Sequence, residues 1–496
     1  MVISPMTQSA GNSRLASAKS DGAKSDGVRH VTDAAKVVAT PLAAWLGLGA
    51  LLLVFLSLCI GSASQKSVTV DELGHLPSGL YSLLSGDPRH AALNPPLLNA
   101  LSSLPVLALD LESALEPVAA SDDVFSFWST GYQFLERHRA DYRRIFAAAR
   151  VVPILLVAAL GLLLFFWAQQ LAPRTPWQAG LLAASLVWFS PGVIANARLV
   201  ATDTGTAVFL TLAVYCFRAM LLRPSVTNVA RFGVLLGLAQ LTKFYALLLY
   251  PALLVVLLAW HALSEPPRSN RTRLLGCYAV ATALSVVVLN AGYFFAEFGT
   301  SLSQLALHSS VLQSLQHGVL GAVPIPLPGA FVRAIDGQFV EVASGLRSFL
   351  VGESFQGGRW DYYLIVLAIK TPLLFFVSFG AAAYALFFRA PLARREVVLL
   401  LTFPVLLFLL LSLGGNRQLG GRALLAAVPL VQLWVAVSWV SLWGEKWRNL
   451  ATGAMIAGAV LVCVATYPDY LSYFNPLVGG NEQGYRNASD ANVDIG

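Results

Sequence analysis

The sequence predicts an all-α polytopic membrane protein with about eleven transmembrane helices and two long connections on one side of the membrane. The first observation is composition: of 496 residues, 56% are hydrophobic and only 12% are charged, whereas soluble proteins average about 25% charged residues. The second is a series of apolar runs about 20 residues long, the length that crosses a bilayer. The third is the concentration of Lys and Arg in alternate short loops. This composition excludes a soluble enzyme, a nucleic-acid-binding protein and a disordered chain.

The first segment, residues 1–36, is polar and contains the pentapeptide Ala-Lys-Ser-Asp-Gly twice, at 18–22 and 23–27. Its composition predicts a disordered cytoplasmic tail. The apolar run that follows begins too late and is too long for a signal peptide.

Eleven apolar segments follow within the predicted membrane domain, residues 37–467. They lie near 40–62, 145–171, 177–196, 202–222, 228–242, 244–264, 274–295, 362–388, 396–414, 421–442 and 447–467. Only Thr242 and Lys243 separate the fifth from the sixth. If these two formed one long kinked helix, every later span would reverse its orientation.

The distribution of Lys and Arg supports eleven spans with the N-terminus inside and the C-terminus outside. With that topology the short inner loops hold twelve cations: Arg174, Arg218, Arg223, Arg231, Arg268, Arg271, Arg273, Arg389, Arg394, Arg395, Lys446 and Arg448. The short outer loops hold four: Arg198, Lys243, Arg417 and Arg422. The net charge of +7 is therefore an orientation signal for a cytoplasmic-membrane protein, and nucleic acid is not expected as a partner.

Two long outer connections, about 63–144 and 296–361, and an outer tail, 468–496, complete the predicted organisation. Within the first connection, residues 72–85 and 95–109 have the length of interfacial helices. Long ordered loops on a rigid scaffold commonly carry function. The four cysteines lie far apart in apolar runs without a CxxC pair, which indicates neither a disulfide framework nor a zinc site.

The strongest candidate for chemistry is the acidic pair Asp71-Glu72, directly after the first span. Adjacent carboxylates near a membrane repel each other and resist desolvation, so one can acquire a raised pKa and accept a proton near neutral pH. The alternative is a helix N-terminus in which Asp71 is the cap and Glu72 lies in the first turn. The two interpretations are compatible.

Asp203 is a second acidic candidate, either as a helix cap or as the partner of Arg198 in a functional ion pair. The cations Arg198, Lys243, Lys370 and Arg422 lie at or near the outer membrane boundary, as does Arg150. Such groups suit a phosphate held at the interface, and snorkelling of single side chains is the alternative.

Two histidines and a turn follow Asp71. His75, Asp87 and His90 together could hold a divalent cation, but their spacing does not support it and solvated histidines are preferred. The sequence therefore predicts no metal and no cofactor. Asn94-Pro95-Pro96 predicts the start of the next helix, and His75 and Asn94 are candidates for acceptor binding or loop support. No P-loop, GxGxxG, HExxH or GxSxG motif occurs, so nucleotide-driven transport and soluble-type hydrolysis have no support.

A set of short motifs in a fixed order resembles one family. They are the Asp71-Glu72 pair, Asn94-Pro95-Pro96-Leu97, the run 199–203 (LVATD), the run 237–244 (GLAQLTKF), Lys370-Thr371-Pro372, Arg422 ahead of Pro429, the run 467–475 (YPDYLSYFN) and Gly479-Gly480. Over about residues 40–496 the chain resembles bacterial integral-membrane glycosyltransferases of the GT-C class. It is most similar to the protein O-mannosyltransferase-like branch, which includes lipid A aminoarabinose transferase.

The resemblance implies transfer of a sugar from a polyprenyl-phosphate donor to a hydroxyl of a lipid, glycan or protein at the extracytoplasmic face. It places the general base on Asp71, with Glu72 beside it, and makes Asp203 a second acidic site residue. Lys243, Lys370 and Arg422 become contacts for the lipid phosphate. A phosphate leaving group already stabilises negative charge, so no metal is obligatory.

Two features depart from the family pattern. The tail motif, usually Asp-Ser-Asn-x-Asp-Trp-Gly-Gln, is replaced by residues 490–496 (DANVDIG), which suggests a truncated or diverged C-terminus. The Gly-x-Arg motif is represented loosely, by Gly420-Gly421-Arg422.

The alternatives to a transferase are a polytopic transporter or flippase of a lipid-linked anion, and a degenerate, non-catalytic homologue.

Overall fold

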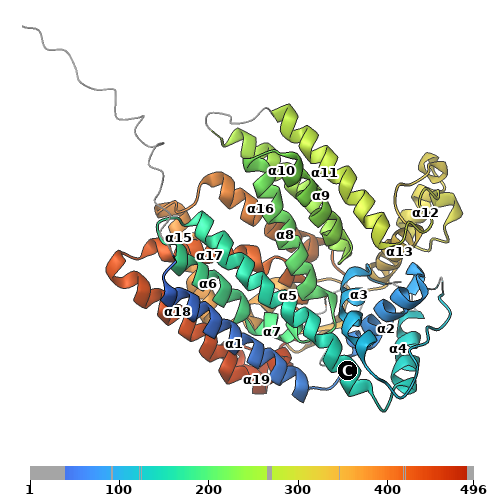
Figure 1. Ribbon diagram of the computed structural model, residues 1–496, viewed down its shortest axis with the longest axis horizontal. Helices are drawn as coiled ribbons and strands as arrows, with labels where there is room; N and C mark the ends of the chain where they lie inside the picture. The colour runs from blue at the N-terminus through green and yellow to red at the C-terminus, as the bar shows by residue number, and fades with distance from the viewer. Residues whose placement is uncertain are drawn as a thin grey trace, which may run out of the picture. The chain divides into compact units, whose positions relative to one another are not determined.

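The computed structural model describes residues 40–90, 93–121, 123, 126–264, 271–345, 347–416, 418 and 420–488. The predicted tail 1–36, the cation Arg417 and the motif that begins at Asp490 lie outside these residues. The described chain is almost entirely helical (Figure 1), as the sequence predicts.

Within the described residues, seven helices are long and apolar enough to cross a membrane. They are α1 (Leu42–Gln65), α5 (Tyr142–Leu171), α8 (Thr202–Leu222), the 3₁₀ segment η3 (Phe244–Leu248) continued by α10 (Leu249–Ala262), α11 (Arg271–Gly292), α16 (Arg394–Gly414) and α18 (Glu445–Thr466).

Two bent pairs of helices in the same part of the chain also meet the criterion, and the number of candidate spans is nine if each pair counts as one span. Helices α6 (Pro176–Trp188) and α7 (Pro191–Ala197) meet at 61°, and α14 (Tyr362–Lys370) and α15 (Leu373–Phe388) meet at 113°. Pro191 and Pro372 stand at the two breaks. Proline lacks the amide hydrogen that would continue the helix and restricts the residue before it.

The remaining two predicted spans contain helices α9 (Val226–Gln240) and α17 (Val428–Leu442), each 15 residues long. At 1.5 Å per residue such a helix covers about 22 Å, less than the roughly 30 Å of a hydrocarbon core. Every predicted apolar segment thus contains a helix, but by length and composition seven to nine qualify as spans instead of eleven.

Small residues allow the helices to pack closely. A side chain on Gly161 of α5 would meet the Trp188 ring of α6 at 2.2 Å, and one on Gly237 of α9 would meet Val288 of α11 at 2.6 Å. Close approach through small residues is typical of helices in membranes, where no hydrophobic force drives them together.

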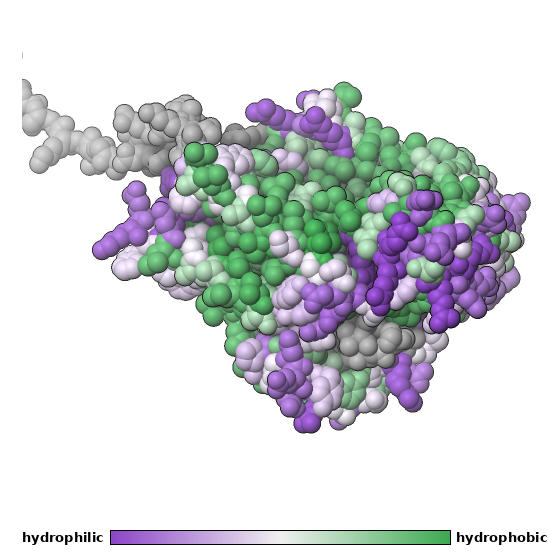
Figure 2. All heavy atoms as spheres, turned by 60° about the horizontal axis from the view of Figure 1, so that its bottom comes forward, coloured by the Kyte–Doolittle hydropathy of each residue, from purple (hydrophilic) through white to green (hydrophobic). Residues whose placement is uncertain are grey.

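The outer surface of the bundle is apolar. Figure 2 shows a broad area of hydrophobic side chains across the middle of one face, with hydrophilic side chains gathered towards its margins. Large apolar residues remain exposed on several spans, among them Leu42, Leu46, Leu53, Phe387, Phe388 and Leu461. A soluble protein rarely exposes such a continuous patch. With the candidate spans, this surface identifies a multi-pass membrane protein.

The first long connection folds into α2 (Val70–Ser85), η1 (Pro88–His90), α3 (Leu97–Ser103), η2 (Leu104–Ala108) and α4 (Ser126–Arg137). These helices gather at one end of the bundle (Figure 1). Both helical stretches expected from the sequence are present. Helix α4 packs on α2 through two glycines: a side chain on Gly131 would lie 2.4 Å from the Leu73 carbonyl oxygen, and one on Gly74 would strike the Phe127 ring.

The second long connection contains η4 (Leu302–Gln304), α12 (Ser310–Gln316), η5 (Val319–Ala322), α13 (Gly329–Ser344) and an antiparallel hairpin of β1 (Arg347–Leu350) and β2 (Glu353–Gln356). After α18 the chain forms η7 (Tyr470–Ser472), η8 (Pro476–Val478), α19 (Gly480–Gln483) and η9 (Gly484–Arg486). Ala488 then bridges to Leu350 of the hairpin. The tail is therefore joined to the second connection.

Candidate active site

The start of α2 is fixed by a capping box. The Glu72 carboxylate accepts hydrogen bonds from the Thr69 backbone N–H at 2.9 Å and from the Thr69 hydroxyl at 3.1 Å. This arrangement occupies donors that a helix N-terminus would otherwise leave unsatisfied. The cap is thus Thr69, and the alternative in which Asp71 caps the helix is wrong. The predicted place of Glu72 in the first turn is confirmed.

Glu72 is fully buried and forms a two-pronged ion pair with Arg150 of α5. Arg150 donates from Nε at 2.7 Å and from Nη2 at 2.6 Å, and the Val200 backbone N–H donates to the same carboxylate at 3.0 Å. Arg150 also donates to the carbonyl oxygens of Ala63, Lys66 and Ser67. Glu72 and Arg150 therefore join the end of α1, the start of α2, α5 and the chain before α8.

Asp71 turns to a different partner, Arg422 at the first position of η6 (Arg422–Ala426). The Arg422 Nη1 atom and the Asp71 carboxylate form an ion pair in which the side chains are 14% and 13% exposed. Burial opposes ionisation of Asp71, but Arg422, His75 and Lys243 outweigh it and hold the pKa of this carboxyl below its ordinary value. Asp71 is consequently ionised at neutral pH.

Asp203, in the first turn of α8, pairs with Lys243, whose Nζ atom lies 2.5 Å from its carboxylate. Lys243 occupies the extended break between α9 and η3. The predicted pair of Asp203 with Arg198 is wrong, because the break that separates the fifth and sixth apolar segments brings Lys243 to Asp203 instead.

These two ion pairs form one charge cluster, defined as Asp71, Asp203, Lys243 and Arg422. Lys243 lies close enough to lower the pKa of Asp71, and both Arg422 and Asp71 act on Lys243. The members come from the start of α2, the start of α8, the α9–η3 break and η6. The structure thus brings together four of the residues that the sequence proposes for the site.

His75 lies one turn after Asp71 and borders the charge cluster. It is 6% exposed, and among the described residues its Nδ1 atom has no hydrogen-bond partner. Burial holds the pKa of His75 below its ordinary value despite the opposing effect of Asp71, so the ring is neutral at pH 7. Its ring meets that of Phe127 edge-on, with centroids 5.4 Å apart.

Arg198 lies elsewhere. Its side chain is 2% exposed, and the charges that act on it are those of Arg150, Glu72, Cys59 and Asp469, none of which belongs to the charge cluster. Burial and Arg150 lower the pKa of Arg198 to about 10, so it stays charged. The structure places Arg198 beside the Glu72–Arg150 pair.

Lys370 and Asn94 are not members of the charge cluster. Lys370 ends α14, donates to the Leu471 carbonyl oxygen at 2.9 Å and lies 4.2 Å above the Phe474 ring, which ties it to the tail. Asn94 is half-buried just before α3, whose first residue Leu97 donates to the Leu241 carbonyl oxygen at 3.1 Å, two residues before Lys243.

The described residues include no group of three or more His, Cys, Asp or Glu side chains that could hold a metal ion. Asp87 is engaged by Arg89, at 2.7 Å, and His90 packs edge-on against Tyr81. The prediction that no metal takes part stays a prediction.

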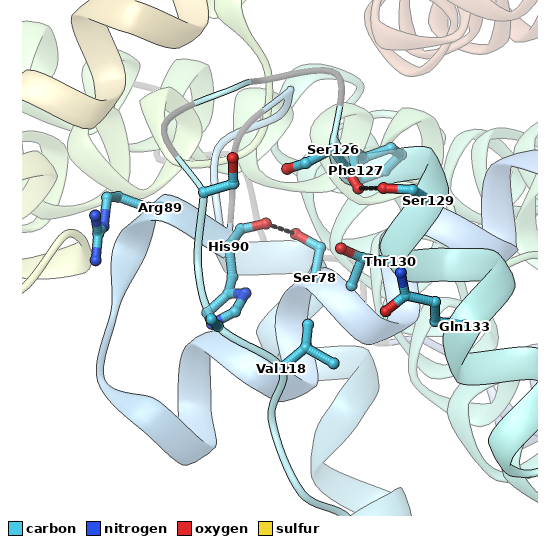
Figure 3. Close-up of a pocket in the computed structure, with 11 residues that line it drawn as sticks. Ser78, Arg89, His90, Val118, Ser126, Phe127, Ser129, Thr130 and Gln133 are labelled. Atoms are coloured by element: carbon cyan, nitrogen blue, oxygen red, sulfur yellow. Dashed lines mark hydrogen bonds between the residues drawn. The ribbon is translucent and has the colours of Figure 1, made fainter.

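A cavity of about 310 Å³ lies within the first connection, two turns along α2 from Asp71 (Figure 3). Its wall comes from α2, η1, residues 118–121 and α4 and is rich in hydroxyls. Phe127, which touches His75, forms part of this wall. The cavity has no signal in the sequence, because residues 118–121 and α4 carry no recognisable motif. The partner of Arg150 has none either, because that contact joins positions 78 residues apart.

Comparisons with known proteins agree with this architecture. Residues 132–305 match the model of the dolichyl-phosphate-mannose-protein mannosyltransferase family. This range contains Asp203 and Lys243 and precedes Arg422. No curated protein matches the sequence.

Solved structures share the fold over most of the chain. ArnT from Cupriavidus metallidurans, bound to undecaprenyl phosphate, superposes with a TM-score of 0.51 and 16% identity over 86% of this chain and 64% of ArnT. The oligosaccharyltransferase of Archaeoglobus fulgidus gives 0.51 and 15% identity over 90% of this chain and 56% of its own length. The oligosaccharyltransferase AglB from Archaeoglobus fulgidus, in complex with an inhibitory peptide and a dolichol-phosphate, gives 0.50 and 14% identity over 90% of this chain and 56% of AglB.

The chain thus spans about 56–64% of the length of these proteins. Both comparisons confirm the resemblance that the motifs indicate. The protein has the polytopic, helical fold of membrane glycosyltransferases, and its residues 132–305 carry the signature of the mannosyltransferase family named above.

Proposed function

We propose that this protein transfers a sugar from a polyprenyl-phosphate-linked donor to a hydroxyl group. The observation that carries the proposal is the charge cluster, in which a buried, ionised carboxylate lies beside two cations at the end of a membrane-embedded bundle. The match to the mannosyltransferase family and the lipid phosphates bound by ArnT and AglB support the same chemistry.

Lys243 and Arg422 are the proposed contacts of the donor phosphate. Each cation is neutralised by a carboxylate in the structure, so the four charges of the cluster sum to zero. A phosphodiester that enters competes with Asp71 for Arg422 and with Asp203 for Lys243. Its binding thereby releases the Asp71 carboxylate at the place where the anomeric carbon lies.

In the proposed reaction the acceptor oxygen attacks the anomeric carbon from the face opposite the phosphate and forms the new glycosidic bond. The bond between that carbon and the phosphate oxygen breaks, and its electron pair leaves with the polyprenyl phosphate. Asp71 takes the acceptor proton as general base. Lys243 and Arg422 stabilise the charge that develops on the leaving phosphate.

Glu72 and Asp203 hold this arrangement in place. Glu72 accepts two hydrogen bonds from Arg150 and one from Val200, so its position at the start of α2 fixes the neighbouring Asp71. Asp203 orients the Lys243 ammonium. We assign both as positioning residues, and Asp71 as the residue that touches the acceptor.

The site is proposed to face the extracytoplasmic side of the cytoplasmic membrane, with the N-terminus inside. The support is the excess of Lys and Arg in the loops at the other end of the spans. A polyprenyl donor, an unidentified hydroxyl acceptor and bilayer lipid are the proposed partners. No metal or other cofactor is included.

The experiment is transfer from purified polyprenyl-phosphate sugars to extracts of membrane lipids and glycans in detergent, with Asp71→Asn as the test. A general base contributes about 10²–10⁴-fold to the rate, so kcat should fall by that factor. The matched control is Asp110→Asn, an exposed residue of the same connection, which should keep full activity. Unchanged turnover in Asp71→Asn would remove Asp71 as the base. Donor binding without turnover in the parent protein would favour a transporter or a non-catalytic homologue.

A further inference from the structure

The cavity of the first connection has no role in the reaction proposed above. It is lined by Ser78, Arg89, His90, Val118, Phe127 and Thr130, with further polar groups from Ser121, Ser126, Ser129 and Gln133 (Figure 3). Its volume of about 310 Å³ falls at the lower end of the range of small-molecule sites.

One face of α2 joins the cavity to the charge cluster. Asp71, His75 and Ser78 stand at positions i, i+4 and i+7, which lie above one another on a helix. Seven residues at 1.5 Å each separate Asp71 from Ser78 by about 10 Å along the axis. The three side chains are buried, and Phe127 covers His75 between the two ends. A ligand in the cavity therefore lies about two sugar rings away from Asp71.

The lining contains a single charged side chain, Arg89, among its described residues. Arg89, the charged member of the wall, is held by Asp87 through a two-pronged pair with distances of 2.7 and 3.1 Å. Burial lowers the pKa of His90, so this ring carries no charge at pH 7. The cavity thus differs from the charge cluster, which is suited to a phosphate, and does not favour an anionic group.

The wall offers hydrogen bonds that the described protein does not use. The Ser78 hydroxyl donates to the His90 carbonyl oxygen at 2.6 Å and keeps its acceptor capacity. The side chains of Thr130, Gln133 and His90 line the cavity without a hydrogen-bond partner among the described residues. Neutral donors and acceptors of this kind, set beside the Phe127 ring, match the alternating hydroxyls and C–H faces of a carbohydrate.

We propose that this cavity is a subsite for the glycan part of the acceptor and holds one or two neutral sugar rings beyond the hydroxyl that reacts at Asp71. This inference rests on the proposed function. It narrows the acceptor from any hydroxyl compound to a carbohydrate or a glycan-bearing lipid. Close contact of Gly131 on α4 with Leu73 on α2 fixes the cavity relative to Asp71, so bound sugar is held in register with the base.

The test is saturation-transfer NMR of neutral disaccharides (chitobiose, mannobiose and lactose) with the full chain in a sugar-free detergent and without donor. At least one disaccharide should bind saturably. Thr130→Val removes one hydroxyl and should raise Kd about fivefold, and Thr130→Trp fills the cavity and should abolish binding. The matched control, Tyr132→Phe, removes a hydroxyl from the same helix at an exposed position and should leave Kd unchanged. Gln133→Leu provides a second test if Thr130→Trp does not fold.

Absence of saturable binding for all three disaccharides overturns the subsite, as does equal binding to the parent and Thr130→Trp. Preferential binding of a serine-containing peptide, or of glucosamine 6-phosphate, to the same cavity also overturns it. The two proposals can fail separately. Sugar binding without transfer from any donor would contradict the proposed function. Transfer without sugar binding in this cavity would contradict only the proposed subsite.

Discussion

Glu72 and Arg150 form a fully buried two-pronged ion pair that fixes the start of the helix on which Asp71 stands. Asp71, the preceding residue in the chain, instead meets Arg422 in the charge cluster. Adjacent carboxylates thus have separate tasks, because successive residues on a helix point about 100° apart. Glu72 ties the helices together through Arg150, and Asp71 faces the cations of the charge cluster.

We expect Glu72→Gln to destabilise the protein by about 3–5 kcal/mol, because it leaves the buried Arg150 guanidinium without a counter-charge. The measurement is thermal unfolding in detergent. The double variant Glu72→Gln/Arg150→Met should unfold at a higher temperature than Glu72→Gln alone. Equal stability of Glu72→Gln and the parent protein would contradict the assignment of Glu72 as an anchor.

Substitution of Arg422 by Gln should lower kcat/KM for the donor by about 10²–10³-fold, since it removes a charged group that stabilises the leaving phosphate. Arg422→Lys should recover part of the loss, because charge remains while the planar geometry is gone. The control is Arg143→Gln, an exposed arginine at the start of α5. A donor KM and kcat close to those of the parent in Arg422→Gln would show that the phosphate binds elsewhere.

The pH profile should also depend on Arg422. In the parent, kcat/KM should be flat from about pH 5.5 to 7, because the lowered pKa of Asp71 keeps this carboxylate ionised throughout the range. In Arg422→Gln the largest opposing cation is gone, so burial raises the pKa of Asp71. The residual activity should then fall as pH decreases through this range. An identical pH profile in the two proteins would show that the ionisation of Asp71 does not control the rate.

Lys370 remains a predicted phosphate contact, and its tie to the tail offers a way to test it. Lys370→Met should raise the donor KM about tenfold if the ammonium reaches the phosphate. Phe474→Leu disturbs the same contact without removing the charge and should leave KM unchanged while it lowers the unfolding temperature. If both variants lose stability equally and neither changes the donor KM, Lys370 serves only to hold the tail and does not contact the phosphate.

The orientation in the membrane can be checked by cysteine labelling of intact cells in a background without the four native cysteines. Ala119→Cys, in the first connection, should react with a membrane-impermeant maleimide. Val226→Cys, which is 87% exposed at the start of α9, should react only after the membrane is opened. The reverse pattern would place the charge cluster on the cytoplasmic side.

The helical scaffold could be predicted because long apolar runs and breakers act locally. Each of the eleven segments contains a helix, and Pro191 and Pro372 mark breaks that a sequence can signal but whose angles it cannot give. By length and composition seven to nine of the described helices qualify as spans, because α9 and α17 are each only 15 residues long. Composition indicates hydrophobicity, but not the length over which a helix remains unbroken.

The site was predicted as a set of residues but not as a set of pairs. Asp71, Asp203, Lys243 and Arg422 were identified from their motifs, yet Arg198 was paired with Asp203 because the two are close in sequence. The structure pairs Asp203 with Lys243, 40 residues away, and Asp71 with Arg422, 351 residues away. Such pairings depend on how the helices pack, which no local pattern encodes.

The distance along the chain between Asp71 and Arg422 also bears on how the protein is made. A chain inserted into the membrane from its N-terminus presents Asp71 well before Arg422, which follows α16 and lies 351 residues further on. Until η6 is in place, the cluster lacks one of its two cations and Asp71 lacks its counter-charge. A chain whose synthesis has not yet passed η6 therefore cannot assemble the charge cluster, however completely its earlier helices have folded.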